Sequence, residues 1–259
     1  MRRPFPALWC MVALALPLAG EPTGAAAASG GCILEVHLAG IVNAGSGAHL
    51  RDAIAAAERQ RCDAVLMVVD TPGGMLDETR DIVSSMLTAR VPILVHVAPA
   101  GARAGSAGAF IAMAAHVVAM APGSTIGAAH PVVGMGSDPE QAGGKHMAAK
   151  VENDTAAFAR SIAEQRGRNL QWAELAVRES ASATAREALE LGVIDHVVGT
   201  TSELLAAVDG TVVKLDGREL TLSLGQSALV PFEPTIQQRA REVLGDPNLA
   251  YALLMLGIL

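Results

Sequence analysis

The sequence predicts an α/β fold built on a parallel β-sheet with helices on its faces. A unit of strand, turn and helix recurs three times before residue 120 with short connections, which is typical of parallel strands. The run Ala64–Val69 is apolar without interruption, as expected of a strand that is buried on both faces. The segment Ser106–Ala115 consists mostly of small apolar residues and is predicted to be a fully buried helix.

The remaining elements follow from hydrophobic periodicity and turn residues. Thr184 and Glu187 form a capping box that opens a short helix, and Gly192 ends it. The glycine-rich stretch 132–144 is expected to be a mobile loop. The predicted strands are Ile33–Leu38, Ala64–Val69, Pro92–Val97, Val117–Met120, Ser124–Ile126 and Val193–Val198. The other predicted helices are His49–Gln60, Leu76–Ala89, Lys150–Arg166 and Trp172–Glu179.

The chain after residue 200 differs from this repeating unit. Two short alternating runs flank Asp216-Gly217, which is a strong hairpin signal, so residues 201–234 are predicted to be a small helix and β-hairpin appendage. Residues 235–259 begin with an amphipathic helix, Thr235–Leu244, and end in the apolar run Leu249–Leu259. That run is shorter than the roughly 20 residues that span a bilayer. It either docks on the domain or, as we expect, begins a truncated transmembrane helix.

The first 28 residues have the three parts of a secretory signal peptide. Arg2 and Arg3 are followed by the uncharged apolar stretch Ala7–Ala19 and by the small residues Ala25–Ala28. Because the apolar stretch is too short to span a bilayer, cleavage is favoured over retention as an anchor. The mature chain is thus expected at the extracytoplasmic, periplasmic face of the inner membrane. The formal net charge of −7, with no basic stripe, argues against a nucleic-acid partner.

Two cysteines remain after removal of the leader. Cys32 and Cys62 each stand just before a predicted strand. If these strands are parallel neighbours, the two sulfur atoms could meet at one edge of the sheet and form a disulfide in an oxidising compartment. Two buried free thiols are the alternative, because the sequence does not give the distance between the Cα atoms.

Two segments could build a nucleophilic site. Asp70–Gly74 follows a buried strand, and its two glycines could aim backbone N–H groups into a cleft as an oxyanion hole requires, although such a turn is also common in loops. Gly101–Gly108 places Ser106 where a loop becomes a helix, so its hydroxyl would lie beside free N–H groups. An ordinary N-cap serine is the alternative.

A serine nucleophile needs a base, and two residues are candidates. Lys150 is predicted to begin a helix, and burial together with the positive helix end would destabilise its ammonium group. An exposed surface lysine is the commoner state of this residue type. His130 stands in a His-Pro pair nearer to Ser106 in the sequence.

Together these segments resemble the NfeD family, which comprises membrane-bound serine proteases of the Clp-protease class that act with stomatin-like proteins. The resemblance extends from about Ile33 to the C-terminus. It rests on the segments Asp70–Gly74, Gly101–Gly108, Ala119–Ala128, Lys150–Asp154, Ser161–Asn169 and Glu187–Asp195.

The resemblance implies a ClpP/crotonase-like fold for a protease domain at 29–200 and a serine endopeptidase activity with no cofactor. It implies a Ser–Lys dyad in which Ser106 is the nucleophile and Lys150 the base. The turn at Gly73 and Gly74, with the N–H of Ala107, would form the oxyanion hole. The implied substrate is an apolar segment of a stomatin-like membrane protein, and the implied assembly is a membrane-associated homodimer.

Three alternatives remain. In cytosolic Clp proteases a histidine at about this interval completes a Ser-His-Asp triad, so His130 is either the base or a residue of the substrate groove; no partner aspartate is obvious. Acyl-CoA hydratases and isomerases share the fold but need acidic residues in the cleft and work in the cytosol. The third alternative is a catalytically idle membrane scaffold that binds a stomatin-like protein.

Overall fold

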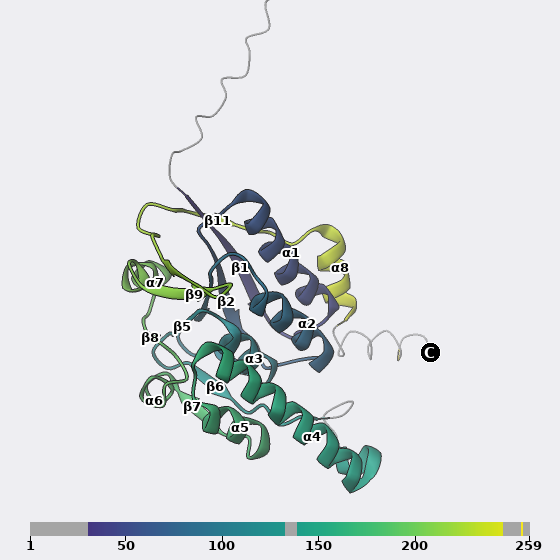
Figure 1. Cartoon of the computed structure of the whole chain (residues 1–259). Coiled ribbons are helices and arrows are strands. Elements are labelled where there is room, and N and C mark those ends of the chain that lie inside the picture. Colours follow the sequence, from purple (N-terminus) through teal and green to yellow (C-terminus); the bar gives the residue numbers. More distant parts are fainter. Residues whose placement is uncertain (1–30, 133–138, 246–254, 256–259) are drawn as a thin grey trace, which may run out of the picture.

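The computed structural model describes residues 31–132, 139–245 and 255. A six-stranded sheet forms its centre, and every neighbouring pair in it is parallel. The strand order is β11-β1-β2-β3-β5-β8. The bounds are β1 Cys32–Ala39, β2 Ala64–Asp70, β3 Ile93–Val97, β5 Val117–Met120, β8 His196–Val197 and β11 Ala228–Pro231. The parallel α/β architecture is therefore confirmed (Figure 1).

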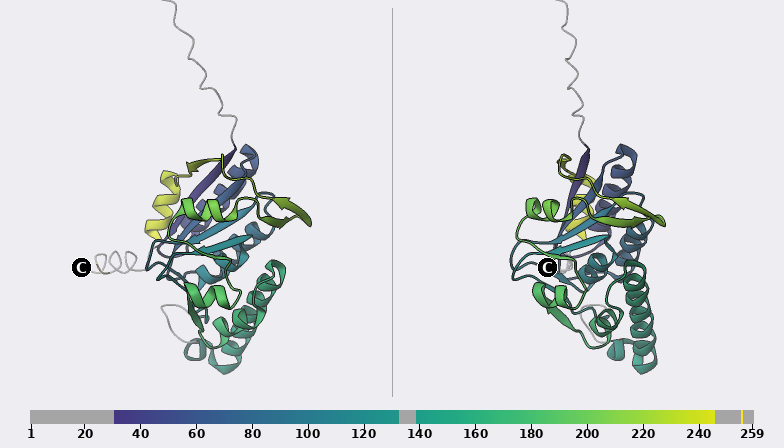
Figure 2. Two further views of the ribbon diagram at one scale, coloured as in Figure 1. Left: turned by 90° about the vertical axis from the view of Figure 1, so that its left-hand side faces the viewer. Right: turned by 60° about the vertical axis from the view of Figure 1, so that its left-hand side comes forward.

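Two hydrophobic clusters lie on the two faces of this sheet. On one face, alternate strand residues such as Val36 and Val65 pack with α1 (Ala44–Gln60), α2 (Leu76–Leu87) and α3 (Ala107–Ala114). On the other face, the intervening strand residues pack with α7 (Thr201–Val208) and with the hairpin that follows it. Figure 2 shows α7 and the hairpin across the sheet from α1. Both sides of the central strands are thus covered, which accounts for their uninterrupted apolar sequence.

A second, smaller sheet and three helices complete the core. Its order is β4-β6-β7, with bounds Arg103–Gly105, Thr125–Gly127 and Ser182–Thr184. The helices are α4 (Pro139–Arg166), α5 (Leu170–Arg178) and α6 (Ala185–Glu190), and the capping box of Thr184 and Glu187 is confirmed at the start of α6.

Two expectations for this region are corrected. Of the stretch 132–144 that was expected to be a loop, residues 133–138 lie outside the described part, and α4 already begins at Pro139 with a break at Gly144 (φ 76°, ψ 169°). The strand expected over 193–198 is reduced to the two residues of β8, because Asp195 turns its carboxylate onto the Val118 N–H.

The C-terminal part contains the hairpin that the sequence predicts. Strands β9 (Val212–Leu215) and β10 (Arg218–Thr221) pair antiparallel around Asp216 and Gly217, both with positive φ, as a type I′ turn requires. Strand β11, which the sequence analysis does not predict, then returns the chain to the main sheet beside β1.

Helix α8 (Ile236–Leu244) follows β11 and packs on α1 (Figure 1). Its apolar residues Ile236, Val243 and Leu244 are exposed, whereas Gln238 is buried. The polar side of this amphipathic helix therefore faces the protein. In the part of the chain that the structure describes, no helix is both long and apolar enough to cross a membrane. The predicted signal peptide (1–28) and all but one residue of the apolar run after Asp246 lie outside that part.

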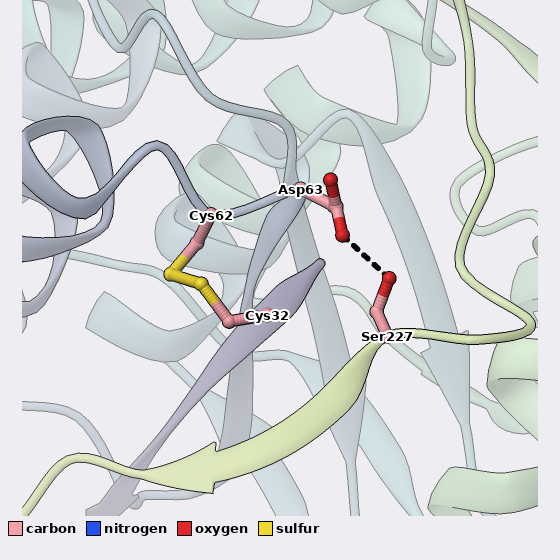
Figure 3. The surroundings of a disulfide bond; sticks show 4 residues. All are labelled: Cys32, Cys62, Asp63 and Ser227. Atoms are coloured by element: carbon pink, nitrogen blue, oxygen red, sulfur yellow. Dashed lines mark hydrogen bonds between the residues drawn. A yellow bond between two sulfur atoms is a disulfide. The ribbon is translucent and has the colours of Figure 1, made fainter. Parts of the chain in front are cut away.

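The two remaining cysteines form a disulfide. Cys32 at the start of β1 is bonded to Cys62, just before β2, with a Cα–Cα distance of 4.6 Å. Figure 3 shows the bond beside a hydrogen bond from the Ser227 hydroxyl to the Asp63 carboxylate. Of the two alternatives that the sequence left open, the disulfide is the one found, because the two strands are direct neighbours in the sheet.

Candidate active site

The predicted nucleophile lies beyond the carboxyl ends of the central strands. Strand β2 ends at Asp70, and the loop Thr71–Gly74 follows it. Thr71 is bridged to Ala104 of β4, and Ser106 comes directly after β4 and directly before α3. The structure thus brings together the two segments predicted to carry nucleophile and oxyanion hole, at the edge where parallel α/β sheets bind ligands.

Ser106 has an unusual backbone conformation. Its φ of 48° and ψ of −109° lie in a sparsely populated region that costs a non-glycine residue on the order of 1–3 kcal/mol. The residue is fixed there by hydrogen bonds from its own N–H to the Gly127 carbonyl (2.8 Å) and from the Ala109 N–H to its carbonyl (2.9 Å). Although Ser106 holds the N-cap position of α3, its side chain makes no capping hydrogen bond. It is therefore not an ordinary N-cap serine.

Gly73 forms the wall opposite this serine. Its φ is 125°, and a Cβ atom added to it would lie 2.6 Å from the Ser106 Cβ and 3.2 Å from the Oγ. A side chain at position 73 would therefore both strain the backbone and displace the hydroxyl. Only glycine leaves room for the nucleophile here.

Close approaches of neighbouring atoms explain the glycines on either side of Ser106. A Cβ on Gly105 would lie 2.9 Å from the Pro72 carbonyl oxygen, and one on Gly108 would lie 2.6 Å from the Thr71 methyl group. All eight residues of α3 are buried, as the sequence predicts. The nucleophile thus stands on a helix that is packed directly against the Gly73 loop.

Thr71 holds the loop together and was missed by the sequence analysis. It is fully buried, and its backbone bonds to β4 on both sides: its N–H donates to the Arg103 carbonyl (2.8 Å) and its carbonyl accepts from the Gly105 N–H (2.9 Å). Its Oγ accepts a hydrogen bond from the Gly73 N–H (3.0 Å) and donates to the Gly73 carbonyl (3.2 Å). The sequence signal that could have indicated this role is a threonine placed between a strand and Pro72-Gly73-Gly74.

The three predicted oxyanion donors differ in their present partners. The N–H of Gly73 is engaged by Thr71. For Gly74, no acceptor for the N–H is found among the residues that the structure describes, and Val42 fixes the peptides on either side of it. Ala107 is the first residue of α3, so its N–H is one of those without a partner inside the helix. Gly74 and Ala107 are thus the donors with free capacity.

Lys150 lies on α4, after the break at Gly144, and its side chain is exposed. The expectations that it begins the helix and that it is buried are therefore wrong for a single chain. Within residues 31–132 and 139–245, no hydrogen bond joins Lys150 to Ser106. The amino-terminal end of α4 extends away from the body of the molecule (Figure 1).

The polar residues that follow Lys150 attach α4 to neighbouring helices. Arg178 of α5 donates to the Glu152 carboxylate and to the Asn153 side-chain oxygen, each at 2.9 Å. Arg80 of α2 pairs with Asp154 at 2.6 Å. The motif after Lys150 is thus an anchoring motif, and the two arginines are the partners that the sequence analysis did not identify.

His130 is half-buried, and its Nδ1 lies 2.9 Å from the Val177 carbonyl oxygen. Because a carbonyl only accepts, the neutral ring carries its proton on Nδ1 and leaves Nε2 free to accept one. In the described part of the chain no hydrogen bond joins His130 to Ser106 or to a carboxylate. The tautomer suits a base, but the triad is not assembled.

A separate cleft of about 390 Å³ lies at the opposite, amino-terminal edge of the sheet. It is lined by His116 and Val117 at the start of β5, by Arg166 and by β9. Burial lowers the pKa of His116 to about 3, with smaller contributions from Arg166 and Arg168.

Among the described residues no group of side chains is suited to hold a metal ion.

Comparison with known proteins identifies the family of this chain. The family model described as "NfeD1b, N-terminal domain" matches residues 33–216. The chain is 36% identical over 209 residues to "Membrane-bound protease PH1510" of Pyrococcus horikoshii, covering 79% of this chain and 46% of that protein. It is 32% identical over 100 residues to "Membrane protein NfeD1b" of Bacillus subtilis, covering 39% of this chain and 22% of that protein. The chain thus spans at most about half the length of these relatives.

Solved structures extend the match to the whole fold. The "1510-N membrane-bound stomatin-specific protease", as a lysine-to-alanine mutant in complex with a substrate peptide, has a TM-score of 0.74 at 30% identity and covers 82% of this chain and 96% of that one. A serine-to-alanine mutant of the same protease has a TM-score of 0.72 at 30% identity, covering 80% and 100%. The expected ClpP-like fold is confirmed, and the chain belongs to the NfeD1b N-terminal-domain family.

Proposed function

We propose that this chain is a serine endopeptidase with Ser106 as its nucleophile. The observation that carries this proposal is the strained serine at the start of α3, whose side chain caps nothing and lies against Gly73. Strain of this kind persists where the surrounding structure enforces it, and it concentrates at active sites. The names of the matched proteases support the same reaction class.

In the proposed reaction the Ser106 Oγ attacks a peptide carbonyl carbon while a base accepts its proton. The negative charge then develops on the carbonyl oxygen, where the N–H groups of Ala107 and Gly74 are available as donors. The amine leaves with a proton from the base, and water releases the acyl group from the serine. The positive amino-terminal end of α3 also stabilises the negative charge on the carbonyl oxygen.

We propose Lys150 as the base. Because its side chain is exposed in the single chain, it must become buried before it can act. A lysine accepts a proton only when its ammonium is destabilised, and exposure to water does not destabilise it. Burial must then come from the bound peptide or from a second copy of the chain. Support comes from the solved relatives, of which one lysine mutant was studied with a substrate peptide.

His130 is the competing base within the same function. Its ring is oriented by the Val177 carbonyl and leaves Nε2 as an acceptor. No carboxylate stabilises the charged ring there among the described residues. We therefore place Lys150 before His130 and assign His130 to the substrate groove.

We propose that the substrate is an apolar segment of a stomatin-like membrane protein. The solved relatives are named as stomatin-specific proteases, and the relative from Pyrococcus horikoshii as membrane-bound. The exposed apolar residues of α8 are consistent with work at the extracytoplasmic membrane surface. A homodimer completes the proposal, with one copy enclosing the Lys150 region of the other.

A catalytically idle scaffold that binds a stomatin-like protein is the other function to be separated. A fluorophosphonate probe reacts with an activated serine hydroxyl and not with an ordinary one. We expect labelling of the wild-type chain at Ser106, identified by peptide mass mapping, and none of Ser106→Ala. An unlabelled wild-type chain that still binds the partner would establish the scaffold.

A further inference from the structure

The C-terminal helix α8 is joined to the Gly73–Gly74 loop by a short chain of contacts. The first link is Val42, which follows β1. Its N–H donates to the Gly73 carbonyl, and its carbonyl accepts from the Met75 N–H, both at 2.9 Å. A Cβ on Gly74 would lie 2.1 Å from the Val42 carbonyl oxygen, so the two backbones are in direct contact. Val42 thus fixes the peptides on both sides of Gly74.

The second link is Asn43, the N-cap of α1. Its Oδ1 accepts hydrogen bonds from the N–H groups of Gly45 (2.9 Å) and Ser46 (3.2 Å), and its own N–H donates to the Ser46 hydroxyl (3.0 Å). Asn43 is 3% exposed. Because Asn43 is the next residue after Val42, the start of α1 and the position of Val42 are set together.

The third link is the contact between this turn and the last turn of α8. The Asn43 Nδ2 donates to the Glu242 carbonyl (3.1 Å), one of the carbonyls that have no partner inside the helix. A Cβ on Gly45 would lie 2.4 Å from the Glu242 nitrogen, so the backbone of α8 rests directly on Gly45. Gln238 adds a hydrogen bond to Asp52 at 2.7 Å.

From this chain of contacts we infer that α8 positions the Gly73–Gly74 loop, with Asn43 and Gly45 as positioning residues. The side chain of Asn43 binds α1 through its oxygen and α8 through its nitrogen, so it couples the two helices. The inference rests on the proposed function, because it gives this coupling a role in forming the oxyanion hole.

The test replaces the coupling nitrogen of Asn43 by an oxygen, and a control that carries the same added charge accompanies it. In Asn43→Asp the cap of α1 is retained, since aspartate caps as well as asparagine, but an acceptor replaces the donor that faces the Glu242 carbonyl. Asn169→Asp is the matched control. Asn169 caps α5 through the Trp172 N–H (2.9 Å), and its Nδ2 donates to the Leu191 carbonyl (2.8 Å), remote from α8.

Two readouts are measured on the full chain. For Asn43→Asp we expect kcat for an apolar peptide to fall about 10-fold with KM nearly unchanged, a fraction of the loss caused by removing an oxyanion donor. We also expect the Met75 amide to exchange with solvent about 10-fold faster, because its bond to Val42 is weakened. Asn169→Asp should change neither.

Equal kcat and equal Met75 exchange in the two variants would overturn the inference. A wild-type chain that takes up no fluorophosphonate would instead overturn the proposed function, and Met75 exchange would still decide the coupling. If Asn43→Asp does not fold, Gly45→Ala replaces it, with Gly47→Ala as control. A Cβ on Gly47 meets the flexible end of Glu78, whereas one on Gly45 meets the backbone of α8.

Discussion

The two halves of the proposed catalytic pair are built differently. The nucleophile region, Thr71–Gly74 with Gly105–Gly108, is held by backbone hydrogen bonds and by contacts too close for any side chain at Gly73 or Gly108. The base region, Lys150–Asp154 on α4, is attached through ion pairs of Arg178 and Arg80, and Lys150 itself is exposed. One region is packed into the core, and the other lies on the surface.

This difference indicates which half of the proposed catalytic pair is incomplete in a single chain. Packing at the end of β2 enforces the serine conformation, so this half needs no partner to be formed. A base, in contrast, requires exclusion of water, and α4 alone does not provide it. We therefore expect changes in the nucleophile region to act on any form of the protein. Changes in the base region should act through the assembled or substrate-bound form.

The largest expected effect is that of Ser106→Ala. Loss of the nucleophile should lower kcat for an apolar peptide on the order of 10⁴-fold or more. The thermal unfolding midpoint should stay near that of the wild type, since alanine removes only a hydroxyl that caps nothing. Peptide cleavage and unfolding are measured on the same preparation. Retention of more than a tenth of the wild-type rate would contradict the assignment of Ser106.

Lys150→Ala should be nearly as damaging, and the double variant with Ser106→Ala little worse than either, because the pair acts as a unit. Lys150→Arg should also be inactive, since a guanidinium does not release its proton near neutral pH. The wild-type rate should rise from neutral to alkaline pH as the base loses its proton. These rates are measured with one peptide across a pH series.

His130→Ala is the control for the base, and we expect it to reduce the rate far less than Lys150→Ala. If His130→Ala abolishes cleavage while Lys150→Ala is mild, the base is the histidine. An active Lys150→Arg would mean that position 150 supplies only positive charge. In either case Lys150 would not be the base, and the comparison above would fail.

Gly73→Ala tests how tightly the nucleophile region is packed. The new methyl group would lie 2.6 Å from the Ser106 Cβ, on a backbone with φ of 125°. We expect kcat to fall about 10²–10³-fold, comparable to the loss of an oxyanion donor. Gly192→Ala is the control, because Gly192 also has positive φ (69°) but open space around it. Equal rates for the two variants would show that the contact with Ser106 is not needed.

Sequence reasoning is strongest where a local pattern fixes the structure. The apolar run of β2, the Asp216-Gly217 turn and the Thr184 capping box are found where they were expected, because each depends on a few adjacent residues. Strand β11 was missed because its pairing with β1 joins residues 32 and 228, and no local pattern reports that contact.

The candidate site shows the same limit. Ser106, Gly73 and Gly74 come together as their motifs predict, but the role of Thr71 depends on a hydroxyl that only the folded loop brings to Gly73. The exposure of Lys150 is the alternative that the sequence left open and could not decide. Its position on α4 depends on a helix that starts at Pro139 and breaks at Gly144, within a stretch whose glycines favour a loop.

The smallest expected effect concerns the hydroxyl of Thr71. Thr71→Val keeps the methyl group that packs near Gly108 but leaves the Gly73 N–H without its acceptor. Loss of a buried partner should lower the free energy of unfolding by about 1–3 kcal/mol. Because the backbone of Thr71 remains bonded to β4, the loop should keep its place. We therefore expect kcat to fall by less than about 10-fold, below the effect of Gly73→Ala.

Thr155→Val provides the same substitution in α4. Thr155 is also buried, but its hydroxyl only adds a bond to the Val151 carbonyl (2.8 Å) inside the helix, so its removal leaves no backbone N–H unpaired. Chemical denaturation and peptide cleavage of both variants give the comparison. If Thr155→Val lost more activity than Thr71→Val, activity would depend more on packing within α4 than on packing of the loop after β2. The base region would then be the part that the single chain organises, contrary to the difference described above.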